Sequence, residues 1–263
     1  MSQYEKAVEI WRSYCAEQPW DLDKYLDSFK VLFAYNSGKI ENEAITYNDT
    51  REIFENGKVS AFTGDARALF EQQNQKLCYE LLKPKIIAKE QLSLELIKEI
   101  HAGLTGGTYD EQRYISRGER PGEFKKHDYV TGVHQVGSPA QEVEQDLLEL
   151  INEINEHGDT KDTLKVATYL HLRFEYIHPF ADGNGRAGRT LLNYYLMING
   201  HPPLVVFDED KRQYYECLQK YDEAEEIAPL YEFFKQQTEK TWAKQIALKQ
   251  GESQSRKGLN DLS

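Results

Sequence analysis

Residues 162–198 read DTLKVATYLHLRFEYIHPFADGNGRAGRTLLNYYLMI and predict two helices joined by a short loop. The first half of this stretch has apolar residues three or four positions apart, which predicts a helix with one face in the core. These residues are Leu164, Ala167, Leu170, Phe174 and Ile177. Pro179 disfavours helical geometry at His178, so the helix should end near Ile177. We expect a tight loop next, and a second helix that starts near Arg186.

The loop 181–185 places two glycines around an asparagine. Glycine permits positive φ, which lets successive backbone N–H groups converge on an anion. The start of the following helix adds further free N–H groups and the positive end of its dipole. Arg186 and Arg189 are three residues apart and share a face, and Asn193 follows one turn later on that face. The pattern therefore predicts a phosphate-binding site.

Two further side chains stand beside this site. His178 is a base with a pKa expected near neutrality, and Asp182 is a hard oxygen ligand for Mg²⁺. Phosphoryl or nucleotidyl transfer needs a base for a hydroxyl proton, a cation on the phosphates and positive charge for the leaving group. The set indicates a nucleoside triphosphate and an attacking alcohol.

Residues 178–189, HPFADGNGRAGR, match the Fic signature H-x-F-x-[DE]-G-N-G-R-x-x-R at every fixed position. The chain therefore resembles the Fic family. The resemblance implies a protein adenylyltransferase, a nucleotidyltransferase that moves AMP from ATP to a Ser, Thr or Tyr hydroxyl of a target protein and of itself. Diphosphate would be released. ATP is then the substrate, and Mg²⁺, or alternatively Mn²⁺, the cation.

The resemblance also implies roles for the residues of the motif. His178 would deprotonate the target hydroxyl, Phe180 would anchor the loop in the core, and Asp182 would bind Mg²⁺. The other matched residues would hold the phosphates, with the last of them on the γ-phosphate: Gly183, Asn184, Gly185, Arg186 and Arg189. The related Doc toxins, which phosphorylate their targets, carry Lys at the position of Gly185, so Gly favours AMP transfer.

Two segments outside the motif resemble other parts of the family site. Residues 120–134 have turn formers at both ends and a β-branched patch, which predicts a β-hairpin. It resembles the family's flap, whose strand edge pairs with an extended segment of the target protein. Tyr214, Tyr215 and Leu218 resemble the adenine pocket, although Asp222 stands where relatives commonly have Asn.

Residues 37–42, SGKIEN, fit the Fic inhibitory pattern [ST]-x-x-x-E-[GN]. The resemblance assigns Ser37 and Glu41 to a built-in brake, in which the Glu41 carboxylate pairs with Arg189 in place of the γ-phosphate. The alternative is a solvated Glu41 in the first turn of a helix, where the dipole stabilises a carboxylate.

Helical spacing recurs along most of the chain, so we expect an all-α, mainly helical fold with the hairpin as a small flap over the active site. We divide it into an N-terminal helical region 1–90 with the inhibitory helix, a catalytic core 91–249 and a loose polar tail 250–263.

Composition narrows the class of protein. A formal net charge of −12 without a stripe of Lys and Arg disfavours nucleic acid as a partner. Three scattered cysteines predict neither disulfides nor a paired-Cys zinc site. No apolar run is long enough for a membrane span, and no signal peptide precedes the first helix, so we expect a cytoplasmic protein.

Several alternatives stay open at this point. Within enzymes, Glu41 could position a water molecule for removal of AMP from a modified protein. The chain could instead be a catalytically silent adaptor with a Fic fold. A zinc site of His171, His178 and Asp182 competes with a reading of His171 as a core residue. The homodimer that relatives often form is a further option. A P-loop ATPase is excluded because no G-x-x-x-x-G-K-[ST] occurs.

Overall fold

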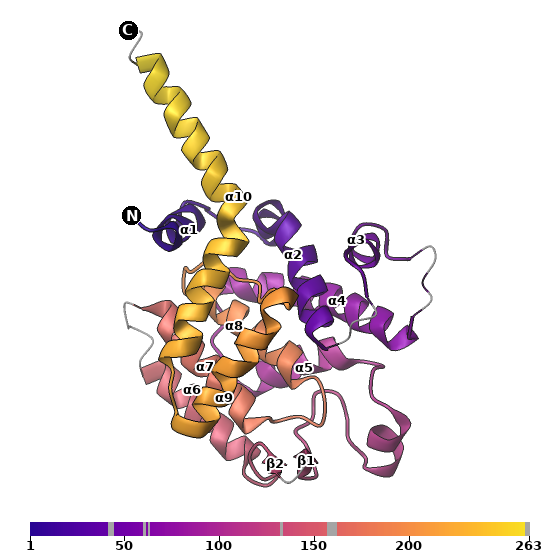
Figure 1. The fold of residues 1–263 in the computed structure, drawn as a ribbon. Coiled ribbons are helices and arrows are strands. Elements are labelled where there is room, and N and C mark those ends of the chain that lie inside the picture. Colours follow the sequence, from indigo (N-terminus) through magenta and orange to yellow (C-terminus); the bar gives the residue numbers. More distant parts are fainter. Residues whose placement is uncertain (42–44, 60–61, 63, 132–133, 157–161, 261–263) are drawn as a thin grey trace.

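The protein is mainly helical in the computed structural model, which describes residues 1–41, 45–59, 62, 64–131, 134–156 and 162–260 (Figure 1). The helices before the hairpin are α1 (Gln3–Arg12), α2 (Pro19–Glu41), α3 (Tyr47–Asn56), α4 (Ala66–Ala88), α5 (Leu94–Thr105) and the π-helical turn η1 (Gln112–Ser116). Those after it are α6 (Val143–Glu156), α7 (Thr163–Ile177), α8 (Asn184–Ile198), the 3₁₀ turn η2 (Asp208–Asp210), α9 (Lys211–Ala224) and α10 (Ala228–Asn260). The prediction of a mainly helical fold is confirmed.

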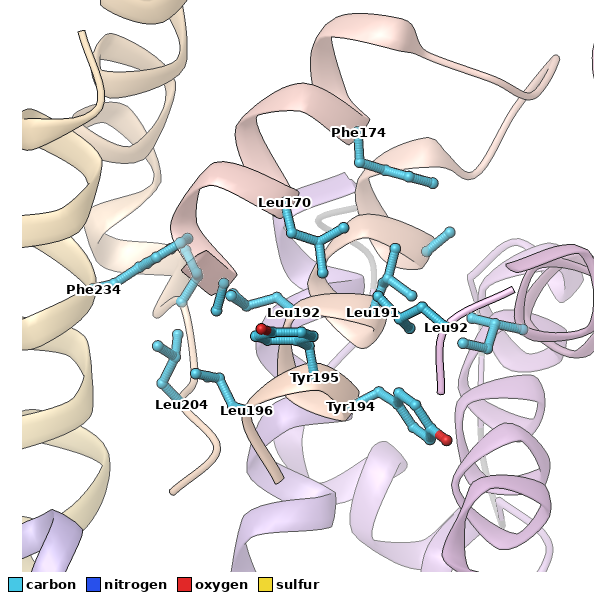
Figure 2. Close-up of a cluster of buried hydrophobic side chains, with 14 of the residues drawn as sticks. Leu92, Leu170, Phe174, Leu191, Leu192, Tyr194, Tyr195, Leu196, Leu204 and Phe234 are labelled. Carbon is cyan, nitrogen blue, oxygen red and sulfur yellow. The ribbon is translucent and has the colours of Figure 1, made fainter. Parts of the chain in front are cut away.

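Helix α8 is the centre of the fold. It packs against α7, α5, α4 and α2, and all but two of its residues are buried. Figure 2 shows how side chains from distant segments meet around it, among them Phe174 from α7, Phe234 from α10 and Leu204. A helix buried on all sides places its first turn at a fixed point inside the molecule. The candidate phosphate site lies at that first turn.

The predicted helix, loop and helix are present, with one shift. Helix α7 ends at Ile177, and His178 follows in the left-handed conformation with φ 51° and its N–H bonded to the carbonyl of Phe174. Helix α8 begins at Asn184, two residues before the predicted start. Gly183 caps it with φ 81°, and a Cβ there would lie 2.5 Å from Thr105 Cγ2. Glycine is required at this turn both for its conformation and for space.

The segment predicted as a hairpin is mostly irregular. Strands β1 (Tyr129–Thr131) and β2 (His134–Val136) pair antiparallel, with Tyr129 opposite Val136. Regular pairing therefore occupies only the end of the stretch 120–134 and continues past it, while residues 120–128 form turns and coil.

A buried carboxylate explains why residues 120–128 do not extend into a strand. Glu119 is fully buried, and its carboxylate accepts hydrogen bonds from the Lys126 backbone N–H at 3.2 Å and the Tyr129 hydroxyl at 3.0 Å. His127 Nδ1 lies 2.9 Å from the same carboxylate. The backbone folds around this carboxylate because a buried charge needs several partners.

The C-terminal end of the chain differs from the expected loose tail. The polar stretch from Gln250 to Asn260 continues α10 as a helix instead of forming a loose tail. In Figure 1 this end of α10 projects beyond the body of the molecule. Helix α1 packs against α10, and one hydrophobic cluster runs from α1 to α10, so the N-terminal region 1–90 shares its core with the rest. No helix in the described ranges has the length and apolar character of a membrane span.

Two helical glycines test the packing of α8. A Cβ on Gly188 would lie 2.3 Å from Glu175 Oε1 and 3.1 Å from Phe174 Cδ1, whereas a Cβ on Gly103 in α5 would lie no closer than 3.6 Å to its neighbours. We expect Gly188→Ala to destabilise the fold by about 1–3 kcal/mol through overpacking. Gly103→Ala should be neutral or stabilise it by up to about 1 kcal/mol. Chemical denaturation measures both, and equal effects would contradict the close contact of α7 with α8.

Candidate active site

The loop between α7 and α8 is locked by the side chain of Asn184. Its Oδ1 accepts the Phe180 backbone N–H at 2.9 Å, and its Nδ2 donates to the Phe180 carbonyl at 2.8 Å. Phe180 is fully buried and stacks on the His101 ring with centroids 3.6 Å apart. Phe180 thus lies in the core as predicted. Both polar ends of the Asn184 side chain are thus engaged within the loop, and the backbone N–H groups at the start of α8 are left to face an anion.

His101 fixes the backbone of the loop, and the sequence did not reveal this role. Its Nδ1 accepts the Gly122 N–H at 2.9 Å, so its Nε2 must carry the proton that faces the Asp182 carbonyl at 2.8 Å. Burial lowers the pKa of His101 to about 4, which keeps the ring neutral. No motif in the sequence marked His101. The bond to Asp182 joins residues 81 positions apart, and local spacing cannot show that.

His178 is a weaker base than expected. Burial, and next the positive charge of Lys125, lower the pKa of its imidazole to about 4. The expectation of a pKa near neutrality is therefore wrong, because the charged form loses its hydration beside a cation. The imidazole is neutral at physiological pH and can accept a proton.

Arg189 is held from the far side by α2. Its guanidinium is buried, and it donates from Nε to Ser37 Oγ at 3.1 Å, from Nη2 to the Ser37 carbonyl at 3.0 Å, and from Nη2 to Glu41 Oε1 at 2.8 Å. Burial alone would lower the pKa of Arg189, but the Glu41 carboxylate, together with Tyr214 and Glu175, outweighs burial and raises the pKa. The ion pair predicted between Glu41 and Arg189 is present in the structure.

Glu41 also lies over the first turn of α8. A Cβ on Gly185 would be 2.5 Å from Glu41 Oε1, so the carboxylate occupies the space that a side chain at 185 would fill. Gly185 is helical, so its use is close approach and not positive φ. Glu41 is the last residue of α2, where the dipole of its own helix disfavours a carboxylate, so the alternative of a first-turn position is wrong. Asn42, the last residue of the pattern, lies outside the described residues.

Asp182 and Arg186 are both engaged by α4. Asp182 Oδ2 accepts from Arg67 Nη2 at 2.7 Å, and Arg186 Nη1 lies 3.1 Å from Glu71 Oε1. Arg186 is buried, whereas 19% of the Asp182 side chain is exposed. Mg²⁺ commonly binds one or two carboxylates and takes its other ligands from phosphates and water. In the parts of the chain that the structure describes, no group of three or more metal ligands occurs, so a cation carried by a nucleotide fits Asp182 better than a protein cage does.

A cavity of about 820 Å³ lies beside His178. Its wall is formed by α7, α9 and the turn after β2, through Gly137, Leu172, Glu175, Tyr176, His178, Tyr215, Leu218, Gln219, Tyr221, Asp222 and Glu223. This volume is in the usual range for small-molecule sites. Two of the residues expected at the adenine, Tyr215 and Leu218, line it, and so does Asp222.

Two residues assigned to the nucleotide from the sequence lie elsewhere. Tyr214 is buried and does not line the cavity, because its hydroxyl lies 2.7 Å from Nε2 of the fully buried His171. His171 is thus a core residue, in agreement with the alternative to a zinc site. Asn193 is buried too, and its amide donates to the Leu204 carbonyl at 2.9 Å and accepts the Leu204 N–H at 2.8 Å. Asn193 therefore joins α8 to the segment before η2, and both polar ends of its amide are engaged there.

Comparison with known proteins shows which family the segment around the motif matches. Residues 91–196 match the model of the Fic/DOC family. The chain carries a Fic domain. It is 28% identical over 215 residues to the protein adenylyltransferase Fic of Drosophila persimilis, covering 79% of this chain and 39% of that protein. The same name belongs to a Drosophila melanogaster protein, at 28% identity and 40% of its length. The chain spans about two fifths of the length of these relatives.

Solved structures agree with the fold of the Fic domain and of the helices around it. A Fic domain containing signaling protein from Bacteroides thetaiotaomicron superposes with a TM-score of 0.80 at 24% identity, covering 95% of this chain and 97% of that one. Residues 134–508 of Fic-1 from C. elegans give 0.78 at 23% identity, covering 95% and 71%. At this identity the likeness establishes the fold, including that of the N-terminal helices.

Glu175 is a further acidic residue at the centre of the Fic domain. Its side chain is 13% exposed, and its Oε1 is buried with no hydrogen-bond partner among the described residues. Burial raises the pKa of its carboxyl to about 7, opposed by Arg189 and supported by Glu41 and Asp222. No local motif marked Glu175, because its environment comes from α8, α9 and α2 together.

The raised pKa of Glu175 predicts a pH-dependent stability. The folded protein keeps this proton while the unfolded chain releases it near pH 4.5, so stability falls as pH rises from about 4.5 to about 7. Glu175→Gln should remove that loss. We expect a variant that matches wild type near pH 4.5 and is more stable by about 1–3 kcal/mol at pH 8. Urea unfolding across this range measures it, with the exposed Glu144→Gln as control. Parallel stability curves for Glu175→Gln and wild type would contradict the assignment.

Proposed function

We propose that this chain is a protein adenylyltransferase. It transfers AMP from ATP to a Ser, Thr or Tyr hydroxyl of a target protein and of itself, and Glu41 inhibits it. The observation that carries the proposal is the carboxylate of Glu41 at the first turn of α8, where it is bound to Arg189 and fills the space that a Cβ on Gly185 would need. An anion thus already lies where the motif predicts a phosphate. The relatives named protein adenylyltransferase support the same activity.

The catalytic step follows from the neutral imidazole of His178. The target hydroxyl gives its proton to His178, its oxygen forms a bond to the α-phosphorus, and the bond from that phosphorus to the bridging oxygen of diphosphate breaks. The free backbone N–H groups of 183–186 and the α8 dipole stabilise the phosphate charge. Arg189 would orient the γ-phosphate once Glu41 has left. Arg186 would add positive charge near the phosphates from its buried position in the first turn of α8.

The remaining parts of the site are proposed from their positions. Asp182 would hold Mg²⁺ or Mn²⁺, which when bound offsets charge on the phosphates. Tyr215 and Leu218 offer apolar surface to the adenine in the cavity. The adaptor reading, the cytoplasmic location and the homodimer stay predictions.

The target segment would bind at β1 and β2. Directly after β2, the Ser138 N–H donates to the Ile177 carbonyl at 3.0 Å, and a Cβ on Gly137 would lie 2.5 Å from His178 Cβ. The pair of strands is thus tied to the backbone of Ile177, directly before the proposed base. An extended peptide added to a strand edge there would have its side-chain hydroxyl placed by main-chain hydrogen bonds.

Loss of Glu41 tests the brake. Glu41→Gly frees Arg189 for the γ-phosphate, and since about 1.4 kcal/mol of preference is tenfold in active population, we expect self-labelling with α-³²P-ATP to rise by about tenfold or more. The exposed Glu55→Gly on α3 is the matched control. Adding His178→Ala should abolish the label. No label in any variant would favour the adaptor, and release of free AMP from a modified protein by wild type would favour the hydrolase.

The low pKa of His178 predicts the pH profile of the transfer. A base must be unprotonated to act, so activity is lost only as pH falls through the pKa near 4. For Glu41→Gly we expect kcat/KM to stay level from pH 8 down to about 5. The Glu41 carboxylate raises the pKa of His178, so removing Glu41 cannot move that pKa toward neutrality. A half-maximal rate near pH 6.5 would show instead that His178 is solvated.

A further inference from the structure

Four buried or half-buried charges form a closed ring beneath the loop. Arg67 donates from Nε to Glu71 Oε1 at 2.9 Å and from Nη2 to Asp182 Oδ2 at 2.7 Å. Glu71 Oε1 also lies 3.1 Å from Arg186 Nη1, and Arg186 Nη2 lies 3.8 Å from Asp182 Oδ1. Two cations thus alternate with two anions, and the ring is neutral. Two of its members come from α4, outside the segment that matches the Fic/DOC model.

The members of the ring differ in their freedom to move. Glu71 and Arg186 are buried, with 5% and 2% of their side chains exposed, and their pairing cannot be broken without stranding a charge. Arg67 is 33% exposed and Asp182 19%. Arg67 uses different nitrogens for its two partners, so Nη2 can leave Asp182 while Nε keeps Glu71. Among these contacts, the one between Arg67 and Asp182 is the one that can open toward solvent.

We propose that Arg67 occupies the cation position on Asp182, so that a divalent cation binds there only by displacing the Arg67 guanidinium. Arg67 contacts Oδ2 of Asp182, and Oδ1 lies 3.8 Å from Arg186 Nη2, so a guanidinium already stands near each oxygen and repels a cation at close range. The contact therefore competes with the cation as Glu41 competes with phosphate. The N-terminal helices thus supply two internal substitutes. Glu41 lies at Arg189, where the triphosphate would bind, and Arg67 lies at Asp182, where the cation would bind. This inference rests on the proposed function only in taking Asp182 as the cation ligand.

The opposite role for Arg67 makes an opposite prediction. If its guanidinium stayed in place and bound the phosphates directly, it would strengthen nucleotide binding, and its removal would weaken binding with or without a cation. If it competes with the cation, removal leaves binding without a cation unchanged and strengthens only the cation-dependent part. The two roles are therefore separated by the sign of the effect and by its dependence on a cation.

The test is calorimetric titration of a non-hydrolysable ATP analogue into the Glu41→Gly protein, once with Mn²⁺ and once with EDTA. The ratio of the two affinities measures the contribution of the cation. Adding Arg67→Ala should raise this ratio about 5- to 10-fold and leave the affinity in EDTA unchanged. Arg67→Gln keeps most of the side-chain stem and should give the same result. It serves as a second variant in case alanine at position 67 disturbs α4. Arg51→Ala, which removes an exposed partner of Glu55, is the matched control.

Each outcome decides the proposal. A ratio that is unchanged or smaller in both Arg67 variants overturns it, and a lower affinity in EDTA assigns Arg67 to the phosphates instead. Asp182→Asn should remove the effect of Mn²⁺, and if it does not, the cation lies elsewhere and the inference falls with that part of the proposed function. AMP transfer is judged separately by the label on the Glu41→Gly protein. Label with an unchanged ratio would leave the enzyme assignment standing and remove only the role of Arg67.

Discussion

The buried guanidinium of Arg189 is the constraint on which the rest of the site depends. A charge removed from water costs several kcal/mol unless it is paired, so this side chain must face an anion. In the structure that anion is Glu41, together with the carbonyl and hydroxyl of Ser37. The first turn of α8 adds free N–H groups and a dipole that favour negative charge. Exchange between a carboxylate and a phosphate at one place is then the simplest way to regulate the site.

The N-terminal helices are consequently part of the site. Gly38 brings α2 so close to α4 that a Cβ would lie 2.0 Å from Gln72 Nε2, and this packing carries Ser37 and Glu41 to Arg189. Helix α4 in turn presents Arg67 and Glu71 to the loop. Any partner or change of assembly that shifted these two helices would alter both contacts at once. Regulation of this chain is therefore expected to act through the packing of α2 on α4.

The sequence predicted what local chemistry determines. Pro179 marked the end of α7, and glycine at 183 marked the turn before α8, because both effects act within a few residues. The pair of Glu41 and Arg189, 148 residues apart, was reached only through resemblance to a family. The sequence assigned Asn193 and Tyr214 to the nucleotide, whereas in the structure they bond to other parts of the core. Helical spacing shows which residues share a helix face, but not which segment packs on that face. The low pKa of His178 depends on burial, which no spacing shows, and Arg67, His101 and Glu175 gain their roles only through tertiary contacts.

The most direct measurement is a crystal structure of the Glu41→Gly protein with a non-hydrolysable ATP analogue and Mg²⁺. We expect the γ-phosphate within hydrogen-bonding distance of Arg189, the phosphates against the backbone N–H groups at the start of α8, and the α-phosphorus facing His178. The base should lie in the cavity beside Tyr215. Density for the nucleotide away from α8, or an Arg189 that keeps its contacts to Ser37 and takes no phosphate, would show that Glu41 and the triphosphate do not share one place.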